Sequence, residues 1–261
     1  MSTLGKQELE AVGAVPADTG KKALGLLATP AIILAGEHAL LLYLYFKRDE
    51  LDASVLESIN VSTLTRLTVE HLALTAVSTV IVLSIAVPVG IILSRKVARK
   101  ATPVVLALAN MGQGAPAIGI VALLAVWLGI GFWPAIIALT LYSILPALRN
   151  TLVGLEQVDP ALVDAGRGIG MSAPAVLFRV ELPLAVPVIL AGVRTTLVLN
   201  VGVAALASFI GAGGLGELVT TGVKLYQLPV LIVGSAMIAM LAMTIDWIAA
   251  IAERYLHPKG V

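Results

Sequence analysis

Cysteine is absent from this sequence of 261 residues, so a disulfide framework and a thiolate metal site are both excluded. Charged residues make up only 13% of the chain and aromatic residues 5%. A soluble domain carries about a quarter charged residues, so an ordinary soluble fold is excluded as well. The net charge of +1 gives no argument for a nucleic-acid partner. The polar first 22 residues lack the apolar run of a signal peptide.

Long apolar segments dominate what is present, with 59% hydrophobic residues and a mean hydropathy of +1.00. A helix needs about 20 apolar residues to cross a bilayer. The sequence therefore predicts an all-α polytopic membrane protein with about six transmembrane helices. Glycine and proline interrupt the third segment at 112–116, and we expect its two halves to form one kinked crossing. The expected spans are 23–46, 69–93, 102–131, 134–148, 187–210 and 229–252.

Basic residues give the expected orientation and the domain limits. Six spans place both termini on one side, and Lys and Arg concentrate in cytoplasmic segments. Residues 1–22, 94–101, 149–186 and 253–261 hold most of them, whereas the opposite side has only Lys47, Arg48, Arg66 and Lys224. We therefore expect a cytoplasmic N-terminal tail (1–22), a first span with an external loop (23–68), a core (69–252) whose 149–186 loop faces the cytoplasm, and a cytoplasmic C-terminal tail (253–261).

The 149–186 segment reads as two short helices joined by a glycine turn. Asp159 is a good N-cap and Pro160 suits the first helical position. Gly168 and Gly170 are expected to stop this helix; Ser172 then begins a second one, which Pro183 ends. Each helix has one apolar side, so both could simply lie among lipid headgroups.

The spacing within this segment favours a more specific interpretation. Asp164-Ala165-Gly166, three residues, Gly170, nine residues and then Val180-Glu181-Leu182-Pro183 resemble the EAA loop of ABC-importer permeases. Asp replaces the Glu of that motif, and Gly replaces its second Ala. The resemblance implies that the loop docks in a cytoplasmic ATPase and carries its movement into the membrane. The shorter Asp164 would weaken any ion pair that the family's Glu makes.

The resemblance covers about 69–252. Segments 71–96, 129–151 and 181–219 are similar to the permeases of glycine betaine, choline and carnitine importers. It implies a type I (MetI-like) permease fold in a prokaryotic inner membrane, without catalytic residues, metal or cofactor of its own, because the partner binds ATP. The implied partners are an ATPase dimer, a second permease chain (identical or paralogous) and an external binding protein. The binding protein would carry the aromatic cage that selects a quaternary ammonium.

Polar residues within the spans are candidates for function because they are costly in hydrocarbon. We expect Asn110, Gln113 and Asn200 to line a passage, since broken helices occur at membrane depth only where protein or water receives them. Arg194 is expected to snorkel to the inner interface. Glu37 and His38 are either a proton relay or a counter-charge for substrate or, more simply, a neutral Glu or a local hydrogen-bonded pair packed on another helix. Glu70, His71 and Asp246 are expected to be hydrated near span ends.

The sequence GAGGLG at 211–216 matches the dinucleotide-binding fingerprint letter for letter. It follows a membrane helix instead of a strand, so a nucleotide site is excluded. We expect a flexible turn after which 215–227 lies as an interfacial helix.

Two other functional classes fit the sequence less well than the importer. A proton-driven secondary transporter would use Glu37 and His38, but it predicts paired broken helices, whereas only the break at 112–116 is clear. An intramembrane enzyme would need a nucleophile paired with a base. His38 and His71 have no Ser or Asp at suitable spacing.

Overall fold

The computed structural model describes residues 17–48 and 51–256, and the described residues contain helices but no strand. Two of its segments, η2 and η4, are 3₁₀ helices, and η3 is a single π-helical turn. The elements are α2 (Ala17–Lys47), α3 (Ala53–Ser58), α4 (Val61–Leu93), η2 (Arg99–Ala101), α5 (Thr102–Gly114), α6 (Ala117–Leu128), α7 (Phe132–Glu156), α8 (Pro160–Gly168), α9 (Ala173–Val176), η3 (Leu177–Glu181), α10 (Leu182–Ala204), η4 (Ala205–Ile210), α11 (Gly216–Lys224) and α12 (Leu228–Leu256).

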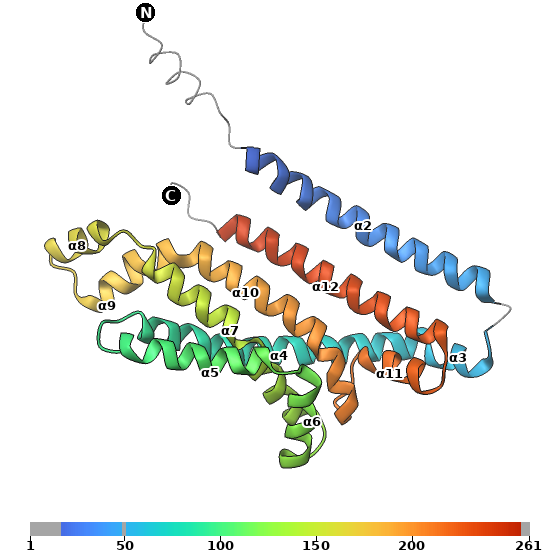
Figure 1. Cartoon of the computed structure of the whole chain (residues 1–261). Coiled ribbons are helices and arrows are strands. Elements are labelled where there is room, and N and C mark those ends of the chain that lie inside the picture. Colours follow the sequence, from blue (N-terminus) through green and yellow to red (C-terminus); the bar gives the residue numbers. More distant parts are fainter. Residues whose placement is uncertain (1–16, 49–50, 257–261) are drawn as a thin grey trace, which may run out of the picture.

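The long helices lie side by side in one elongated bundle (Figure 1). Helices α4, α7 and α10 pack against one another, α12 packs on α10, and α2 lies along α12 at the edge. Helices α8 and α9 lie at one end of the bundle, and α2 begins and α12 ends on the side of the bundle nearer to them. Helices α3 and α11 lie at the opposite end. The cytoplasmic location of both termini stays a prediction, and most of the predicted tails, residues 1–16 and 257–261, lies outside the described residues.

Five described helices are long and apolar enough to cross a membrane, and the bent pair α5–α6 brings the number to six if it counts as one span. Most helices extend beyond the predicted spans. Helix α4 has 33 residues, which at 1.5 Å each give about 50 Å, against a hydrocarbon core of about 30 Å. Apolar runs indicate only the lipid-embedded part of a helix and miss its polar ends. Residues 17–22 and 253–256 are therefore predicted as tails, whereas both segments are helical.

The break between α5 and α6 is sharper than predicted. The two helices make an angle of 96°, so α6 does not continue the direction of α5, and the pair forms either one broken span or a re-entrant loop. Ala115 is extended (φ −74°, ψ 150°), as expected for a residue before a proline, and Pro116 precedes the first residue of α6. Gly112 has a different role, because a Cβ there would lie 2.6 Å from the Leu141 carbonyl oxygen. It lets α5 approach α7 closely.

The prediction that Pro183 ends a helix is wrong. Pro183 is in the first turn of α10, and the preceding residues are already helical from Ala173 onward. Proline removes one backbone hydrogen bond, and local π-helical adjustment lets a membrane helix tolerate that loss. The π-helical turn η3 lies directly before α10. The short second helix of the loop therefore runs without interruption into a span.

Close backbone approaches hold α4, α7 and α10 together. A Cβ at Gly90 of α4 would lie 2.7 Å from the Thr151 side chain of α7, and one at Gly192 of α10 would lie 2.6 Å from Asn150 Cβ. Small residues at such positions allow helices to pack tightly in membranes. An apolar cluster that includes Val82, Ala86 and Leu148 packs between α4 and α7. The three helices thus form the core to which the remaining helices attach.

Candidate functional site

The α8–α9 loop is shaped by local capping that follows from its sequence. The Asp159 carboxylate accepts a hydrogen bond from Ala161 N (2.8 Å), and Ser172 Oγ accepts one from Ala175 N (3.4 Å). At the end of α8, Met171 N donates to Gly166 O (3.1 Å) and Gly170 N donates to Arg167 O (2.9 Å). These two bonds form a Schellman motif whose C′ residue takes a left-handed conformation. Both N-caps and the glycine stop are confirmed as predicted.

Two glycines of this loop serve different purposes. Gly170 has φ +89° with no atom within 4 Å of a Cβ built on it, so the backbone conformation alone demands glycine. Gly166 is buried, and a Cβ there would lie 3.4 Å from Met171 Sδ and 3.5 Å from Val176 Cγ2. Those are ordinary contacts, so alanine fits at Gly166, whereas any side chain at Gly170 is strained.

The residues of the predicted motif lie on both faces of the loop. Asp164, Ala165, Gly170 and Pro183 are exposed, and Val180 and Leu182 are half-buried. Asp164 pairs only loosely with Arg167 (3.6 Å), and both side chains are exposed. Three exposed apolar side chains accompany them, namely Leu162, Ile169 and Phe178. The loop therefore presents a mixed charged and apolar surface at the end of the bundle, while Val176 is buried beneath it.

An ion pair beneath this loop joins residues that the sequence analysis treated separately. The Arg95 guanidinium donates to Glu181 Oε1 (Nη1–Oε1 3.1 Å) and, through Nη2, to Oε2. Arg95 follows α4, whereas Glu181 ends η3, 86 residues later. The pair lines a cavity of about 320 Å³ with Ser94, Lys96, Leu155, Glu156, Val163 and Arg167. In the sequence, Arg95 is one of the basic residues of 94–101 that predict the orientation in the membrane. No local pattern indicates a partner 86 residues away.

Arg194 forms ion pairs with α12, and its predicted reach toward the inner interface stays a prediction. Its Nε and Nη2 donate to the two carboxylate oxygens of Asp246 at 2.6 and 2.7 Å, and Glu253 lies 3.6 Å away. The bidentate pair connects α10 with α12. Asp246 keeps part of the exposure that was expected for it, and its carboxylate also provides the counter-charge that a partly buried cation needs. The pair is a structural tie between two helices.

Glu37 and His38 are exposed on α2 and are not packed on another helix as expected. His38 Nδ1 lies 2.7 Å from Leu34 O of its own helix. Helix α2 packs on α12 and has no direct place in the α4–α7–α10 core. Gly36 lies against Met240 of α12, so this side of α2 faces α12. Glu37 and His38 consequently point away from α12.

Asn200 is enclosed in the core and does not line a surface. Its Oδ1 accepts a hydrogen bond from Ser143 Oγ (2.7 Å) and its Nδ2 donates to Thr79 Oγ1 (2.9 Å), while its own exposure is 0%. The side chain thus ties α10 to α7 and α4. His71 is fully buried too, with Nε2 2.9 Å from Val201 O, so its predicted hydration is wrong. Asn110 is exposed and Gln113 half-buried on α5, and their predicted role at a passage stays a prediction.

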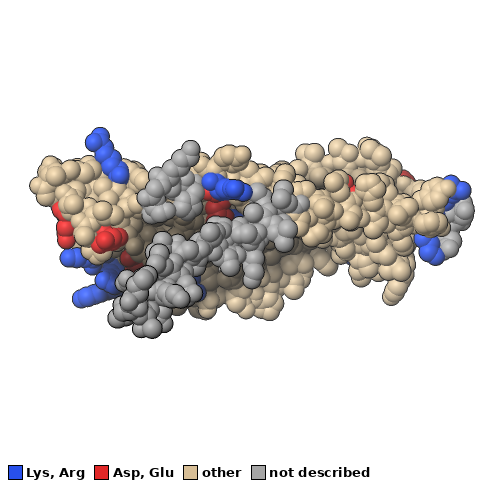
Figure 2. Space-filling view, turned by 90° about the horizontal axis from the view of Figure 1, so that it is seen from above, with Lys and Arg blue, Asp and Glu red and all other residues tan. Residues whose placement is uncertain are grey.

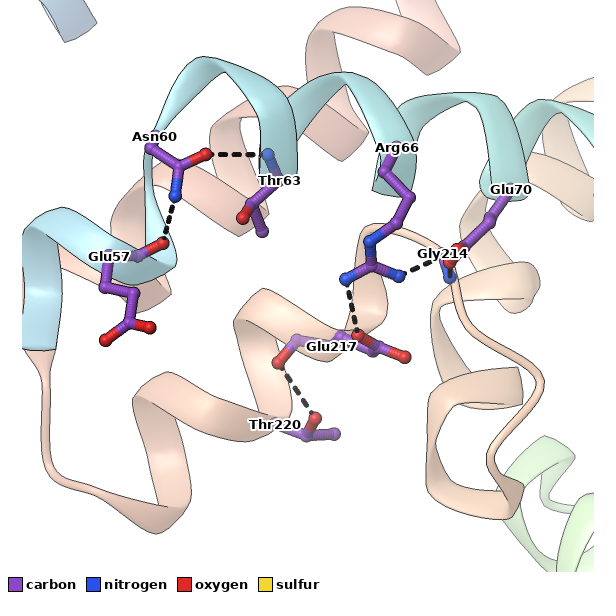
Figure 3. A network of polar contacts seen from close by, with 8 residues as sticks. All are labelled: Glu57, Asn60, Thr63, Arg66, Glu70, Gly214, Glu217 and Thr220. Atoms are coloured by element: carbon purple, nitrogen blue, oxygen red, sulfur yellow. Dashed lines mark hydrogen bonds and ion pairs between the residues drawn. The ribbon is translucent and has the colours of Figure 1, made fainter.

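Polar contacts connect the glycine turn 211–216 to α4 (Figure 3). Gly214 N donates to Glu70 Oε2 (3.0 Å), and Arg66 joins Glu70 (2.7 Å) to Glu217 of α11 (3.6 Å). Gly213 and Gly214 have φ of +83° and +87°, and any Cβ at Gly213 would collide with the Glu70 carboxylate. Helix α11 buries Leu218 and packs on α12, so it is not a free interfacial helix.

Comparison with known proteins assigns the chain to a family. Residues 86–259 match the profile of the binding-protein-dependent transport system inner membrane component. The choline transport system permease protein OpuBB of Bacillus subtilis is 42% identical over 194 residues, which cover 74% of this chain and 88% of that protein. The osmoprotectant import permease protein OsmW of Salmonella typhimurium is 41% identical over 207 residues, covering 77% of this chain and 95% of the relative.

Solved structures agree with this assignment. A chain of the MetNI methionine ABC transporter, in an inward facing conformation, superposes with a TM-score of 0.67 at 26% identity, covering 75% of this chain and 96% of that chain. An amino acid ABC transporter determined with histidines shares the fold, with a TM-score of 0.64 at 18% identity over 78% of this chain and 100% of that chain. The chain therefore belongs to the family of inner membrane components of binding-protein-dependent transport systems and has the all-helical, MetI-like permease fold.

Proposed function

We propose that this chain forms the translocation path of an ATP-driven importer for a quaternary-amine osmoprotectant such as choline, glycine betaine or carnitine. The names of its relatives, among them a glycine betaine/carnitine/choline permease 42% identical over 192 residues, support this substrate class. The observation that carries the proposal is the α8–α9 loop. It is a rigidly capped surface at one end of the bundle, continuous with a membrane-spanning helix, and it has the spacing of an ATPase-docking motif.

The distribution of charge supports a cytoplasmic location for this loop. On the face shown in Figure 2, most Lys and Arg side chains lie toward the α8–α9 end, and a smaller group lies at the opposite end. Basic residues concentrate on the cytoplasmic side of membrane proteins. The proposed partners are a cytoplasmic ATPase dimer on this end, a second permease chain beside this one and an extracytoplasmic binding protein at the α3–α11 end.

The proposed mechanism is alternating access. Closure of the ATPase dimer on ATP draws the α8–α9 loops of two permease chains together and opens the path toward the loaded binding protein; hydrolysis reverses the movement. Because α9, η3 and α10 are continuous from Ala173, displacement of the loop acts directly on a spanning helix. The chain itself needs no cofactor in this scheme, since the partner binds ATP.

A proton-coupled transporter is the weaker candidate. Glu37 and His38 would have to exchange protons with a path, yet both lie on the exposed side of α2, which packs on α12. An ATP-driven importer does not require Glu37 or His38 to carry protons.

Reconstitution with and without the ATPase tests the proposed function. Proteoliposomes that hold this permease, its ATPase and its binding protein should accumulate labelled choline or glycine betaine only with ATP inside. Uptake of equal size without the ATPase would contradict the proposal.

A glycine pair tests the role of the loop. Gly170→Val should abolish uptake, because a β-branched residue at φ +89° costs about 1–3 kcal/mol and deforms the docking surface. Gly166→Ala is the matched control and should retain uptake, since its Cβ meets only ordinary contacts. Full uptake by Gly170→Val would show that the loop shape is not needed.

A further inference from the structure

The ion pair between Arg95 and Glu181 lies where the α8–α9 loop meets the membrane helices. Glu181 is the last residue of η3, the turn that connects the loop to α10, and it is only 6% exposed. Arg95 lies two residues beyond the end of α4. The pair is thus a direct polar contact between the loop and the longest helix of the three-helix core.

The geometry of this contact fixes both distance and direction. Both carboxylate oxygens of Glu181 accept from the two terminal nitrogens of Arg95, and Arg95 Nε also donates to Ile91 O (3.3 Å) within its own chain segment. A bidentate, charge-assisted pair specifies orientation as well as proximity. Breaking it would leave a buried carboxylate without its counter-charge.

The apolar contacts around the pair do not impose the same constraint. Leu155, Val158 and Ala185 form a small cluster that also includes Ile91 of α4 and Val163 of α8. Packed apolar helices can slide by small shear movements, whereas a fork-shaped ion pair resists sliding. The pair is therefore the contact best suited to make α4 follow η3.

Further polar contacts continue this connection along α4. Asn200 of α10 bonds to Thr79, and the Val201 carbonyl contacts His71. At the far end, Glu70 holds the backbone of Gly214, just beyond η4 (Figure 3). Helix α4 and the segment 173–214 are consequently tied at their inner end, in the middle and at their outer end.

We propose that Arg95 and Glu181 are positioning residues that join α4 to the coupling loop, so that both move as one body and a displacement at the α8–α9 end reaches the glycine turn 211–216. This inference rests on the proposed function, and it assigns to the pair the transmission of movement, distinct from docking of the ATPase. The pair does not contact substrate.

Charge variants test the proposal in the complete importer with its ATPase and binding protein. Arg95→Gln and Glu181→Gln should each lower uptake by about tenfold or more, within the range of coupling between residues in direct contact. ATPase association and basal ATP hydrolysis should stay, because the exposed face of the loop is unchanged. The double variant Arg95→Glu with Glu181→Arg should restore uptake to within about threefold of wild type. Arg99→Gln, which removes an exposed charge at the same end, is the control and should have no effect.

Replacing the Arg95–Glu181 ion pair by a covalent cross-link shows whether the two residues stay together during transport or the contact only stabilises the resting fold. The chain has no cysteine, so Arg95→Cys with Glu181→Cys gives a unique pair of thiols. Without treatment this variant should transport poorly, and bridging the thiols with a short bismaleimide should bring uptake back. If bridging abolished the remaining uptake, the two residues would have to separate during the cycle, and the proposal would be wrong.

The outcomes distinguish this inference from the proposed function. Normal uptake in the single variants, or a charge reversal that fails to rescue variants that assemble and hydrolyse ATP normally, would overturn the inference alone. Failure of the wild-type permease to take up substrate in an ATPase-dependent way would instead overturn the proposed function.

Discussion

Helices α2 and α4 have nearly the same length, 31 and 33 residues, and both are apolar, yet they have very different places in the molecule. In its most apolar window α4 is 33% buried and α2 only 6%. The polar residues explain the difference. In α4, His71 and Thr79 bond to other helices, whereas Glu37 and His38 of α2 lie exposed. Apolar character alone therefore does not identify a core helix; polar groups that find partners across helices do.

The largest loss of stability is expected when the hydrogen bonds of Asn200 to Ser143 and Thr79 in the core are removed. Asn200→Ala leaves a cavity at a fully buried site and removes the partner of Ser143 and Thr79, and it should cost about 3 kcal/mol. Glu37→Ala, on the exposed side of α2, should leave the melting temperature in detergent unchanged. Equal melting temperatures for the two variants would remove the distinction between the helices.

A pair of glycines gives a smaller and sharper contrast. Gly90→Ala in α4 brings a Cβ to 2.7 Å from the enclosed Thr151 side chain, and overpacking of this kind should cost about 1–2 kcal/mol. Gly36→Ala in α2 meets Met240 at an ordinary 3.7 Å, so the better helix propensity of alanine should make it neutral or slightly stabilising. Thermal unfolding in the same detergent compares both. A destabilised Gly36→Ala together with an unaffected Gly90→Ala would reverse our ranking.

The smallest effect is expected from the ionisable residues of α2. Glu37→Gln combined with His38→Gln should leave ATP-driven uptake unchanged from about pH 5 to 8, the range in which histidine ordinarily titrates. Initial uptake rates across this range measure it. A lost pH dependence in the double variant would give α2 a proton-handling role and support the secondary-transporter alternative.

Local features of the structure were predictable because their causes lie within a few residues. Asp159, Ser172 and Gly170 cap and stop helices through hydrogen bonds to neighbours, so sequence spacing identifies them. The number and approximate position of the apolar helices follow from hydropathy in the same way.

Contacts between distant residues could not be predicted. Arg194 and Asp246 are 52 residues apart, and Arg95 and Glu181 are 86 apart. The sequence around each of these residues therefore does not indicate which residue is its partner. Treated singly, such residues are expected to seek water. The prediction for Pro183 is wrong for a different reason. The rule that proline ends a helix comes from helices in water, whereas a membrane helix tolerates the lost hydrogen bond through a π-helical turn.

Cross-linking shows directly whether the α8–α9 loop contacts the ATPase. Ala165→Cys places a single thiol on the exposed loop of this cysteine-free chain, and Lys224→Cys places one at the opposite end of the bundle. In membranes that contain the assembled importer, a thiol-to-amine cross-linker should join the ATPase to the Ala165→Cys permease and not to the Lys224→Cys permease. Cross-linking of the ATPase through position 224, with none through position 165, would contradict the account.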